Sequence, residues 1–331
     1  MTEILTTASL SLLVVSFLVG IVVGLTGMGG GALMTPALIL FGIPPAAAVA
    51  NDLVSASVTK SVGAAVHWKG GSPNLKLAGW LVAGSVPTAF AGAFIIKAVT
   101  GEGQEGPFIK LAIGATLLLT AATYTLRMYL QMVKNQQEDG RQPLVGDPPI
   151  KPLPTLLVGA TGGLLVGLTS VGSGSLIMVA MVLLYPRLSP LRLVGTDLVQ
   201  AIPLVISAAI SHVIVSGVDL PVLIPLIIGG SAGTFLGARI ASWVSSSVIR
   251  RGIVLVLTLT GLTMLKVPPT WVGVIGAAFL VLGPVGWGVV RRFHGLPPFE
   301  TLPVPHPGGT DRHTGSSDKA SATTTGREPR D

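Results

Sequence analysis

Residues 24–31 read GLTGMGGG, and residues 167–174 read GLTSVGSG. The tripeptide DLV at 52–54 recurs at 197–199, so the similarity extends well beyond one glycine-rich motif. A chain that repeats itself at a long interval is built from duplicated structural units. The sequence therefore predicts two homologous repeats, each with a glycine-rich stretch followed by an aspartate.

Both repeats lie in strongly apolar sequence. Half of the 331 residues are hydrophobic, 11% are charged, and the mean hydropathy is +0.74. Such a chain is too apolar for an ordinary soluble core with a polar surface, and a span of roughly 20 apolar residues crosses a bilayer. We therefore predict an all-α polytopic membrane protein surrounded by lipid. Its apolar stretches lie at about 4–25, 46–68, 75–98, 107–130, 154–170, 192–215, 220–243, 250–266 and 270–290, with shorter ones at 29–42 and 172–185.

Composition also excludes several other classes of protein and site. The chain has no cysteine, which excludes disulfides and thiolate metal sites. Its net charge of +7 comes from Lys and Arg residues in short loops between spans, not from one basic face, so nucleic acid is not expected as a partner. The first apolar stretch follows Met1-Thr2-Glu3, which lacks the basic residue of a signal peptide, so we expect a retained span.

The apolar stretches and the internal similarity divide the chain into five parts. Residues 1–130 form the first membrane repeat, and residues 154–266 form the second. A polar linker at 131–153 joins them and is expected to be cytoplasmic. An additional span at 267–293 has no counterpart in the first repeat, and a tail at 294–331 is too poor in aliphatic residues to order itself.

The distribution of positive charge indicates how the repeats are oriented, because loops rich in Lys and Arg remain cytoplasmic. Lys69 and Lys76 follow the aspartate-bearing span of the first repeat, where the second repeat has only Asp219. Arg187 and Arg192 precede the corresponding span of the second repeat, where the first repeat has no charge. The bias inverts, so we predict two inverted structural repeats, as in many secondary transporters. The N-terminus is then outside and the C-terminus cytoplasmic.

The glycine-rich stretches are the first candidates for a binding site. They interrupt the helical pattern, which predicts broken helices or re-entrant hairpins. Helix N-termini at such breaks present backbone N–H groups to an anion; the alternative is that these glycines only permit tight turns or close helix packing. The candidate substrate-binding residues are Gly27, Met28, Gly29, Gly30, Gly31, Ser170, Gly172, Ser173, Gly174 and Ser175.

The aspartate-bearing spans supply a second set of candidates. At helical spacing, Asp52, Ser55 and Thr59 fall on one stripe, and Asp197 and Gln200 fall on the matching stripe. A carboxylate inside a span is costly and faces the protein interior with a partner. These residues are candidates for a coupling site for a proton or a sodium ion, or for a gate; the alternative is a capping or helix-locking role.

A lysine and two histidines also lie on these spans, and we interpret the lysine as a candidate binding residue but the histidines as interfacial. Lys60 has Val205 as its counterpart, and this lone cation is a candidate to bind an anionic substrate or to pair with Asp52, whereas its long stem could equally reach the membrane interface. His67 and His212 lie near span ends and are interpreted as interfacial hydrogen-bonding residues.

A row of small residues recurs in both repeats. Gly229, Gly233 and Gly237 stand four residues apart, and Gly84, Thr88 and Gly92 are their counterparts. Small residues at this spacing let helices approach closely. We interpret both rows as structural.

Three motifs also carry a family resemblance: GLTGMGGGALMTP at 24–36 with its weaker copy at 167, NDLVSASVTKSVGAAVHWKG at 51–70, and GTDL at 195–198. They resemble the sulfite exporter TauE/SafE family over roughly residues 9–266. The resemblance implies a permease of the inner membrane. It also implies sulfur-containing anions as substrates, such as sulfite, thiosulfate, sulfonates or sulfoacetate.

Other functions are weighed against this transporter. An intramembrane serine protease would require an activated serine beside a histidine, and Ser173 with His212 could be proposed, but Val171 stands where the expected GxSG pattern begins. No HExxH or Walker motif is present, so we expect neither an enzyme nor a cofactor. An anion channel or a lipid flippase remains the main alternative. The sequence does not give the oligomeric state.

Overall fold

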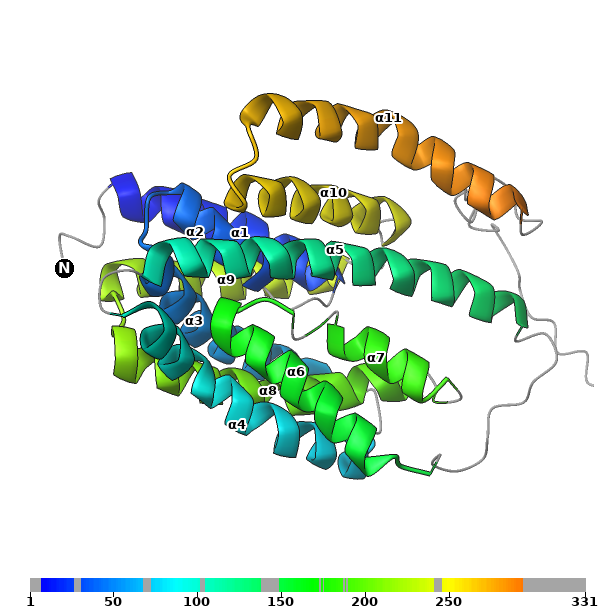
Figure 1. The fold of residues 1–331 in the computed structure, drawn as a ribbon, viewed down its shortest axis with the longest axis horizontal. Coiled ribbons are helices and arrows are strands. Elements are labelled where there is room, and N and C mark those ends of the chain that lie inside the picture. Colours follow the sequence, from blue (N-terminus) through cyan, green and yellow to red (C-terminus); the bar gives the residue numbers. More distant parts are fainter. Residues whose placement is uncertain are drawn as a thin grey trace, which may run out of the picture.

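The computed structural model describes residues 7–26, 31–67, 73–101, 105–137, 149–172, 174, 176–186, 188, 190–240 and 246–293. Helices account for nearly all of this part of the chain (Figure 1). They are α1 (Thr7–Thr26), α2 (Gly31–Leu40), α3 (Pro45–His67), α4 (Leu75–Thr100), α5 (Glu105–Gln137), α6 (Pro152–Thr169), α7 (Leu176–Leu184), α8 (Pro190–Ser216), α9 (Leu220–Ile240), α10 (Ser246–Met264) and α11 (Pro269–Phe293).

The helices match the apolar stretches, and the prediction of an all-α polytopic membrane protein is confirmed. Within the described residues, α4, α5, α6, α8 and α9 are long and apolar enough to cross a bilayer. The long helix α3 is not among these five, and it carries Asn51, Asp52 and Lys60. α5 continues to Gln137 and so extends past residue 131, where the linker is expected to begin.

Helix packing follows a reciprocal pattern. The most extensive contacts join α1 to α9 and α4 to α6, while α3 packs against α8 and α5 against α10. Each pair joins one helix of the first expected repeat, α1–α5, to one of the second, α6–α10. In chain order α1 corresponds to α6 and α4 to α9, so the α1–α9 and α4–α6 pairs correspond to each other. The α3–α8 and α5–α10 pairs each correspond to themselves. Two units related by an approximate two-fold axis have contacts of this kind. The inverted orientation itself stays a prediction.

Glycines permit the close approach within the two most extensive pairs. A Cβ atom added to Gly233 or Gly237 on α9 would lie 2.1 Å from the carbonyl oxygen of Phe17 or 2.2 Å from that of Ile21 on α1. On α6, a Cβ atom at Gly163 would lie 2.3 Å from the carbonyl oxygen of Ser85 on α4. Helix backbones are therefore in direct contact here, as the small-residue rows predict.

Two hydrogen bonds repeat the reciprocal pattern at single residues. The backbone N–H of Asp219, just before α9, donates to the side-chain oxygen of Asn51 on α3 at 3.2 Å. The backbone N–H of Asn74, just before α4, donates to the hydroxyl of Thr196 on α8 at 3.0 Å. Asn51 and Thr196 each directly precede one of the two aspartates, so these bonds dock α9 and α4 beside the aspartate-bearing helices.

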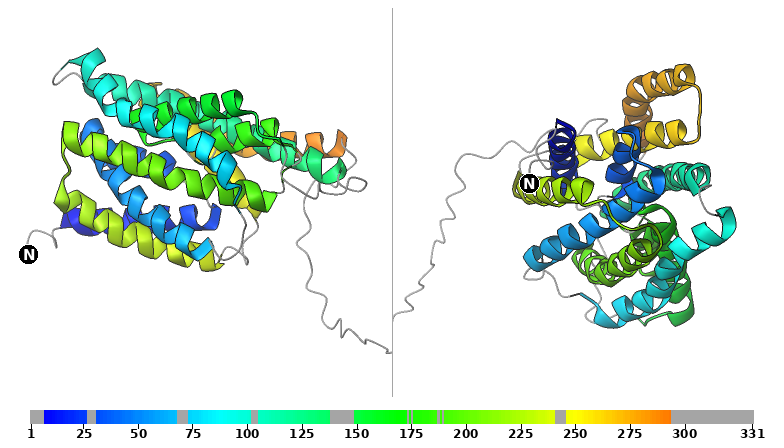
Figure 2. Two further views of the ribbon diagram at one scale, coloured as in Figure 1. Left: turned by 90° about the horizontal axis from the view of Figure 1, so that it is seen from below. Right: turned by 90° about the vertical axis from the view of Figure 1, so that its left-hand side faces the viewer.

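The ends of the bundle differ in the elements they bring together. The starts of α3 and α5 and the ends of α4 and α8 lie at one end, which is also where α1 begins (Figure 1). The helix α11 packs mainly against α10 and lies to one side of the other helices (Figure 2). α11 therefore contributes little to the centre of the bundle, as expected for a span without a counterpart.

Candidate functional site

The ends of α2 and α6 meet inside the bundle. Gly31 begins α2, and a Cβ atom on it would lie 1.8 Å from the carbonyl oxygen of Ser170. Ser170 ends α6 in the left-handed conformation, with φ of 61°. Gly172 follows with φ of 109°, and Gly174 lies in a turn before α7. Among the candidate substrate-binding residues, Gly27, Met28, Gly29, Gly30, Ser173 and Ser175 lie outside the described residues.

Asp52 is the polar centre of this meeting point. It lies on α3, is 2% exposed, and accepts hydrogen bonds on Oδ2 from the hydroxyls of Thr35 and Ser170. The bond from Ser170 is 2.8 Å long and joins the two halves of the chain. Two candidates from different motifs, Asp52 and Ser170, are therefore in direct contact. Thr35 was not singled out from the sequence, although it belongs to the quoted motif at 24–36.

A small cavity lies against the Asp52 stripe. Asp52, Ser55 and Thr59 line it from α3, and Gly230 and Thr234 line it from α9. Its volume is about 20 Å³, which is enough for about one water molecule. These three side chains of α3 therefore face the same cavity, while their role stays a prediction.

Asp197 on α8 has a different set of partners. It is 7% exposed, and the amide nitrogen Nε2 of Gln200 donates to its Oδ1 at 3.0 Å. The amide oxygen of Gln200 is buried and has no hydrogen-bond partner in the described part of the chain. The two predicted residues of this stripe are thus adjacent, and they keep one free acceptor that a donor could engage.

Lys60 connects the two aspartates electrostatically. Its charge interacts with Asp197 on α8 and with Asp52 on its own helix. The pairing of Lys60 with Asp52 stays a prediction. The valine at the corresponding position of α8 has no charge, so the two halves of the site are electrostatically unequal.

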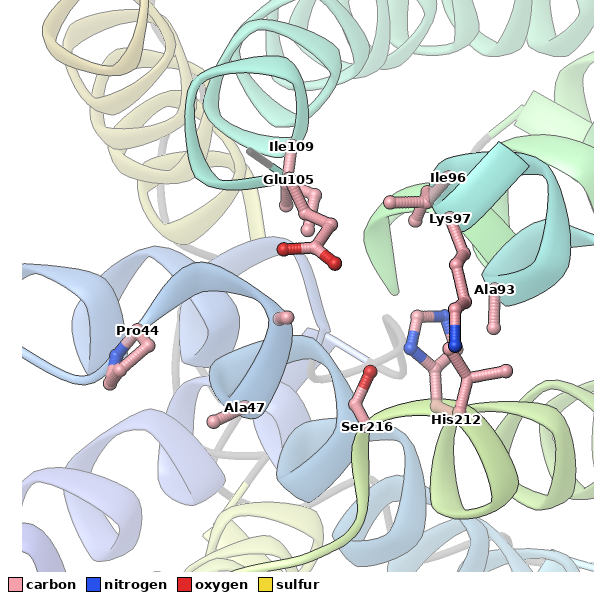
Figure 3. Close-up of a pocket in the computed structure, with 11 residues that line it drawn as sticks. Pro44, Ala47, Ala93, Ile96, Lys97, Glu105, Ile109, His212 and Ser216 are labelled. Atoms are coloured by element: carbon pink, nitrogen blue, oxygen red, sulfur yellow. The ribbon is translucent and has the colours of Figure 1, made fainter. Parts of the chain in front are cut away.

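A larger cavity of about 370 Å³ opens at the end of the bundle where α3 and α5 begin. Its polar lining residues are Lys97 from α4, Glu105 from α5, and His212 and Ser216 from α8 (Figure 3). His212 is 1% exposed, and its Nε2 lies 2.7 Å from the carbonyl oxygen of Gly167 on α6.

The interpretation of His212 as an interfacial residue is wrong, because α6 covers this face of α8. Lys97 and Glu105 were missed as candidates because their sequence surroundings carry no motif. Only the packing of three helices brings these side chains to one cavity.

Comparisons with known proteins agree with the fold. A family model described as "Sulfite exporter TauE/SafE" matches residues 12–264. From Bacillus subtilis, "Probable membrane transporter protein YjnA" is 34% identical over 258 residues, which cover 78% of this chain and 100% of that protein. "Probable membrane transporter protein YdhB" of the same organism is 25% identical over 256 residues, covering 77% of this chain and 99% of that protein. No solved structure matches the chain.

Proposed function

Because the chain belongs to the sulfite exporter TauE/SafE family, we propose that it is a secondary transporter that moves a small anion across the cell's inner membrane. The anion is a sulfur oxyanion or an organosulfonate such as sulfite, thiosulfate or sulfoacetate. Support for this substrate class comes from the family description, while support for an anion comes from the chemistry of the site.

The observation that carries the proposal is the contact between the broken helices at Asp52. Irregular backbone at membrane depth is tolerated only where protein covers it or where it lines a cavity. The end of α6 and the start of α2 meet at Gly31 and Ser170, and the hydroxyl of Ser170 reaches Asp52 on a third helix. A site assembled from helix ends of both halves can bind an ion and respond when the halves move.

The substrate is bound by the glycine-rich segments Gly27–Gly31 and Ser170–Ser175 together with Lys60. Backbone N–H groups near helix N-termini, serine hydroxyls and an ammonium group are all donors that suit an oxyanion. The electrostatic interaction of Lys60 with both aspartates supports its place in this set, since an anion bound at Lys60 would alter the field at both carboxylates.

The coupling ion is a proton or a sodium ion at Asp52, Ser55 and Thr59. These side chains line a cavity of about 20 Å³, a size that suits one water molecule or one ion of similar radius. Asp197 and Gln200 form the second half-site and act in gating, and the unpartnered amide oxygen of Gln200 supports such a polar role.

The two halves act as inverted repeats, with the N-terminus outside and the C-terminus in the cytoplasm. The reciprocal helix pairs and the reciprocal hydrogen bonds of Asn51 and Thr196 support a two-fold relation between the halves. Lys151 directly precedes α6, Arg192 lies in the first turn of α8, and Arg239 lies in the last turn of α9, whereas Asp219 precedes the start of α9; this distribution of charge supports the orientation.

Flux measurements on proteoliposomes test the proposal. Radiolabelled sulfite, thiosulfate and sulfoacetate are offered to the wild type and to Asp52→Asn and Lys60→Met under imposed proton or sodium gradients. We expect saturable flux that one of the gradients drives, with at least a tenfold loss in both variants, because each removes a charge of the coupled site. Lys266→Met, which removes an exposed lysine outside the site, serves as the matched control.

The competing functions give different results in the same assay. Flux that does not saturate and does not respond to either gradient would indicate a channel. Absence of flux for all three anions would remove the sulfur-anion substrate class.

A further inference from the structure

The larger cavity, which we call the His212 cavity, is separate from the Asp52 site and has its own set of polar groups. Lys97, Glu105, His212 and Ser216 line it from α4, α5 and α8, and its volume of about 370 Å³ exceeds that of a small oxyanion with several waters. Figure 3 places the His212 ring beside Lys97 and near Ser216, with Glu105 on the opposite wall.

The hydrogen bond to α6 fixes the tautomer of His212. A carbonyl oxygen can only accept, so Nε2, 2.7 Å from the oxygen of Gly167, must carry the hydrogen. In the neutral ring, Nδ1 is then an acceptor. This atom is buried and has no hydrogen-bond partner among the described residues. A buried acceptor without a donor is unfavourable, so this position suits a ligand that carries a hydrogen-bond donor.

The charges around His212 restrict the ligand further. The ammonium group of Lys97 and the hydroxyl of Ser216 can both face anionic oxygens. The carboxyl group of Glu105 repels a doubly charged ligand more than a singly charged one. Pro44, just before α3, and Ala46 and Ala47 on α3 line the cavity, and α6 contributes the Gly167 carbonyl, so neither segment adds a titratable group.

We propose that the His212 cavity binds the singly protonated form of a small oxyanion. The ligand O–H donates to Nδ1 of His212, and its charged oxygens face Lys97 and Ser216. From a singly charged ligand such as hydrogen sulfite, the proton can pass from the ligand oxygen to Nδ1, which leaves an imidazolium and a doubly charged anion with no atom gained or lost. After the transfer, Nδ1 of the imidazolium donates the hydrogen bond to the ligand oxygen, and this bond holds the ion pair together.

The cavity is connected to the Asp52 site through α6. Gly167 accepts from His212, and one turn later Ser170 donates to Asp52. A change of charge on His212 strengthens its bond to the same helix end that holds Asp52. This part of the inference rests on the proposed transport function, whereas binding in the cavity does not.

Calorimetric titration of the purified full chain tests the binding. The probes are sulfite and inorganic phosphate, which carry an O–H group near neutral pH, and sulfate, which does not. We expect the wild type to bind sulfite and phosphate at least tenfold more tightly than sulfate, with sulfite binding tightening as the pH falls and more of it is protonated. Equal affinity for sulfate and phosphate would overturn the proposal.

Variants identify the cavity as the binding site. His212→Gln keeps an amide donor for the Gly167 carbonyl, but its amide oxygen cannot take up a proton as Nδ1 can, so this variant should reduce the preference over sulfate and lose about tenfold in phosphate affinity. Lys97→Gln removes an exposed lysine at the rim and should lower the affinity for all three anions. Lys110→Gln, on α5 outside the lining residues, should bind like the wild type.

Lys97→Gln keeps the test decisive if His212→Gln does not fold, because an unchanged affinity in this variant would overturn the proposal. The transport assay separates the two hypotheses. Phosphate binding that depends on Lys97 and His212, without flux of any sulfur anion, would keep the cavity and remove the proposed substrate. Sulfur-anion flux without such binding would remove the cavity and keep the function.

Discussion

At the scale of single residues, the contacts of Asp52 and the backbone of Ser170 depend on each other. Ser170 adopts a left-handed conformation, which costs a non-glycine residue roughly 1–2 kcal/mol, and its hydroxyl donates to Asp52. The first repeat has glycine at the corresponding position, residue 27. A strained serine where glycine would fit indicates that the hydroxyl is needed.

Two substitutions at Ser170 separate the hydroxyl from the backbone. Ser170→Ala and Ser170→Gly both remove the bond to Asp52, so both should lose at least tenfold in transport. Ser170→Gly should be the more stable of the two by roughly 1–2 kcal/mol, because glycine adopts the left-handed conformation without strain. Flux and thermal unfolding measured on the same preparations check this, and full transport by Ser170→Ala would show that the hydroxyl is dispensable.

A second comparison at this scale concerns the reciprocal hydrogen bonds. Thr196 is fully buried and so is its bond to Asn74, whereas Asp219, which donates to Asn51, is exposed to solvent. Thr196→Ala should therefore destabilise the fold by about 1–3 kcal/mol, the cost of a buried unpaired N–H group. Water can replace the Asn51 oxygen at Asp219, but Asn51 is itself fully buried and also donates to the Ala47 carbonyl, so Asn51→Ala leaves a cavity and should cost more than Thr196→Ala. Equal unfolding midpoints for the two variants would contradict this difference.

At the scale of helices, the glycines of α6 and α9 determine how closely the pairs pack. A Cβ atom at Gly163 would lie 2.3 Å from the Ser85 carbonyl oxygen, which is backbone and cannot rotate away. Gly163→Ala should thus force α4 and α6 apart and destabilise the protein by about 1–3 kcal/mol.

The control for this prediction is Gly79→Ala on α4. Nothing lies within 4 Å of the Cβ position there, so alanine should be neutral or stabilise the helix by up to about 1 kcal/mol. Unfolding temperatures in the same detergent compare the two variants. Equal unfolding temperatures for the two variants would show that close backbone contact does not stabilise the α4–α6 pair.

At the scale of the whole molecule, the orientation in the membrane can be measured directly, because the chain has no native cysteine. Asp219 and Lys151 are exposed; Asp219 lies between the end of α8 and the start of α9, and Lys151 directly precedes α6, which begins at the other end of the bundle (Figure 1). Asp219→Cys should react with a membrane-impermeant maleimide in intact cells, and Lys151→Cys should react only after the cells are opened. The reverse labelling pattern would invert the predicted topology.

The sequence predicted the helices and part of the site. The features that it predicted depend on local patterns, and those that it missed depend on packing between distant segments. Apolar stretch lengths and helical spacing are local, so the helices and the Asp52 stripe could be derived directly. The contact of Ser170 with Asp52 was not predicted; the similarity of the two glycine-rich stretches only identified Ser170 as a candidate. Lys97, Glu105 and the burial of His212 depend on which helices pack together across long sequence separations, and no local pattern encodes that.

The exchanged helix pairs also affect how the protein is made. α1 finds its main partner in α9, and α4 finds its main partner in α6, so each pair joins segments from opposite halves of the chain. A ribosome delivers the first half into the membrane before either partner exists. Those helices remain in lipid with their glycine surfaces uncovered until then, so the two most extensive helix pairs form only after the second half is inserted.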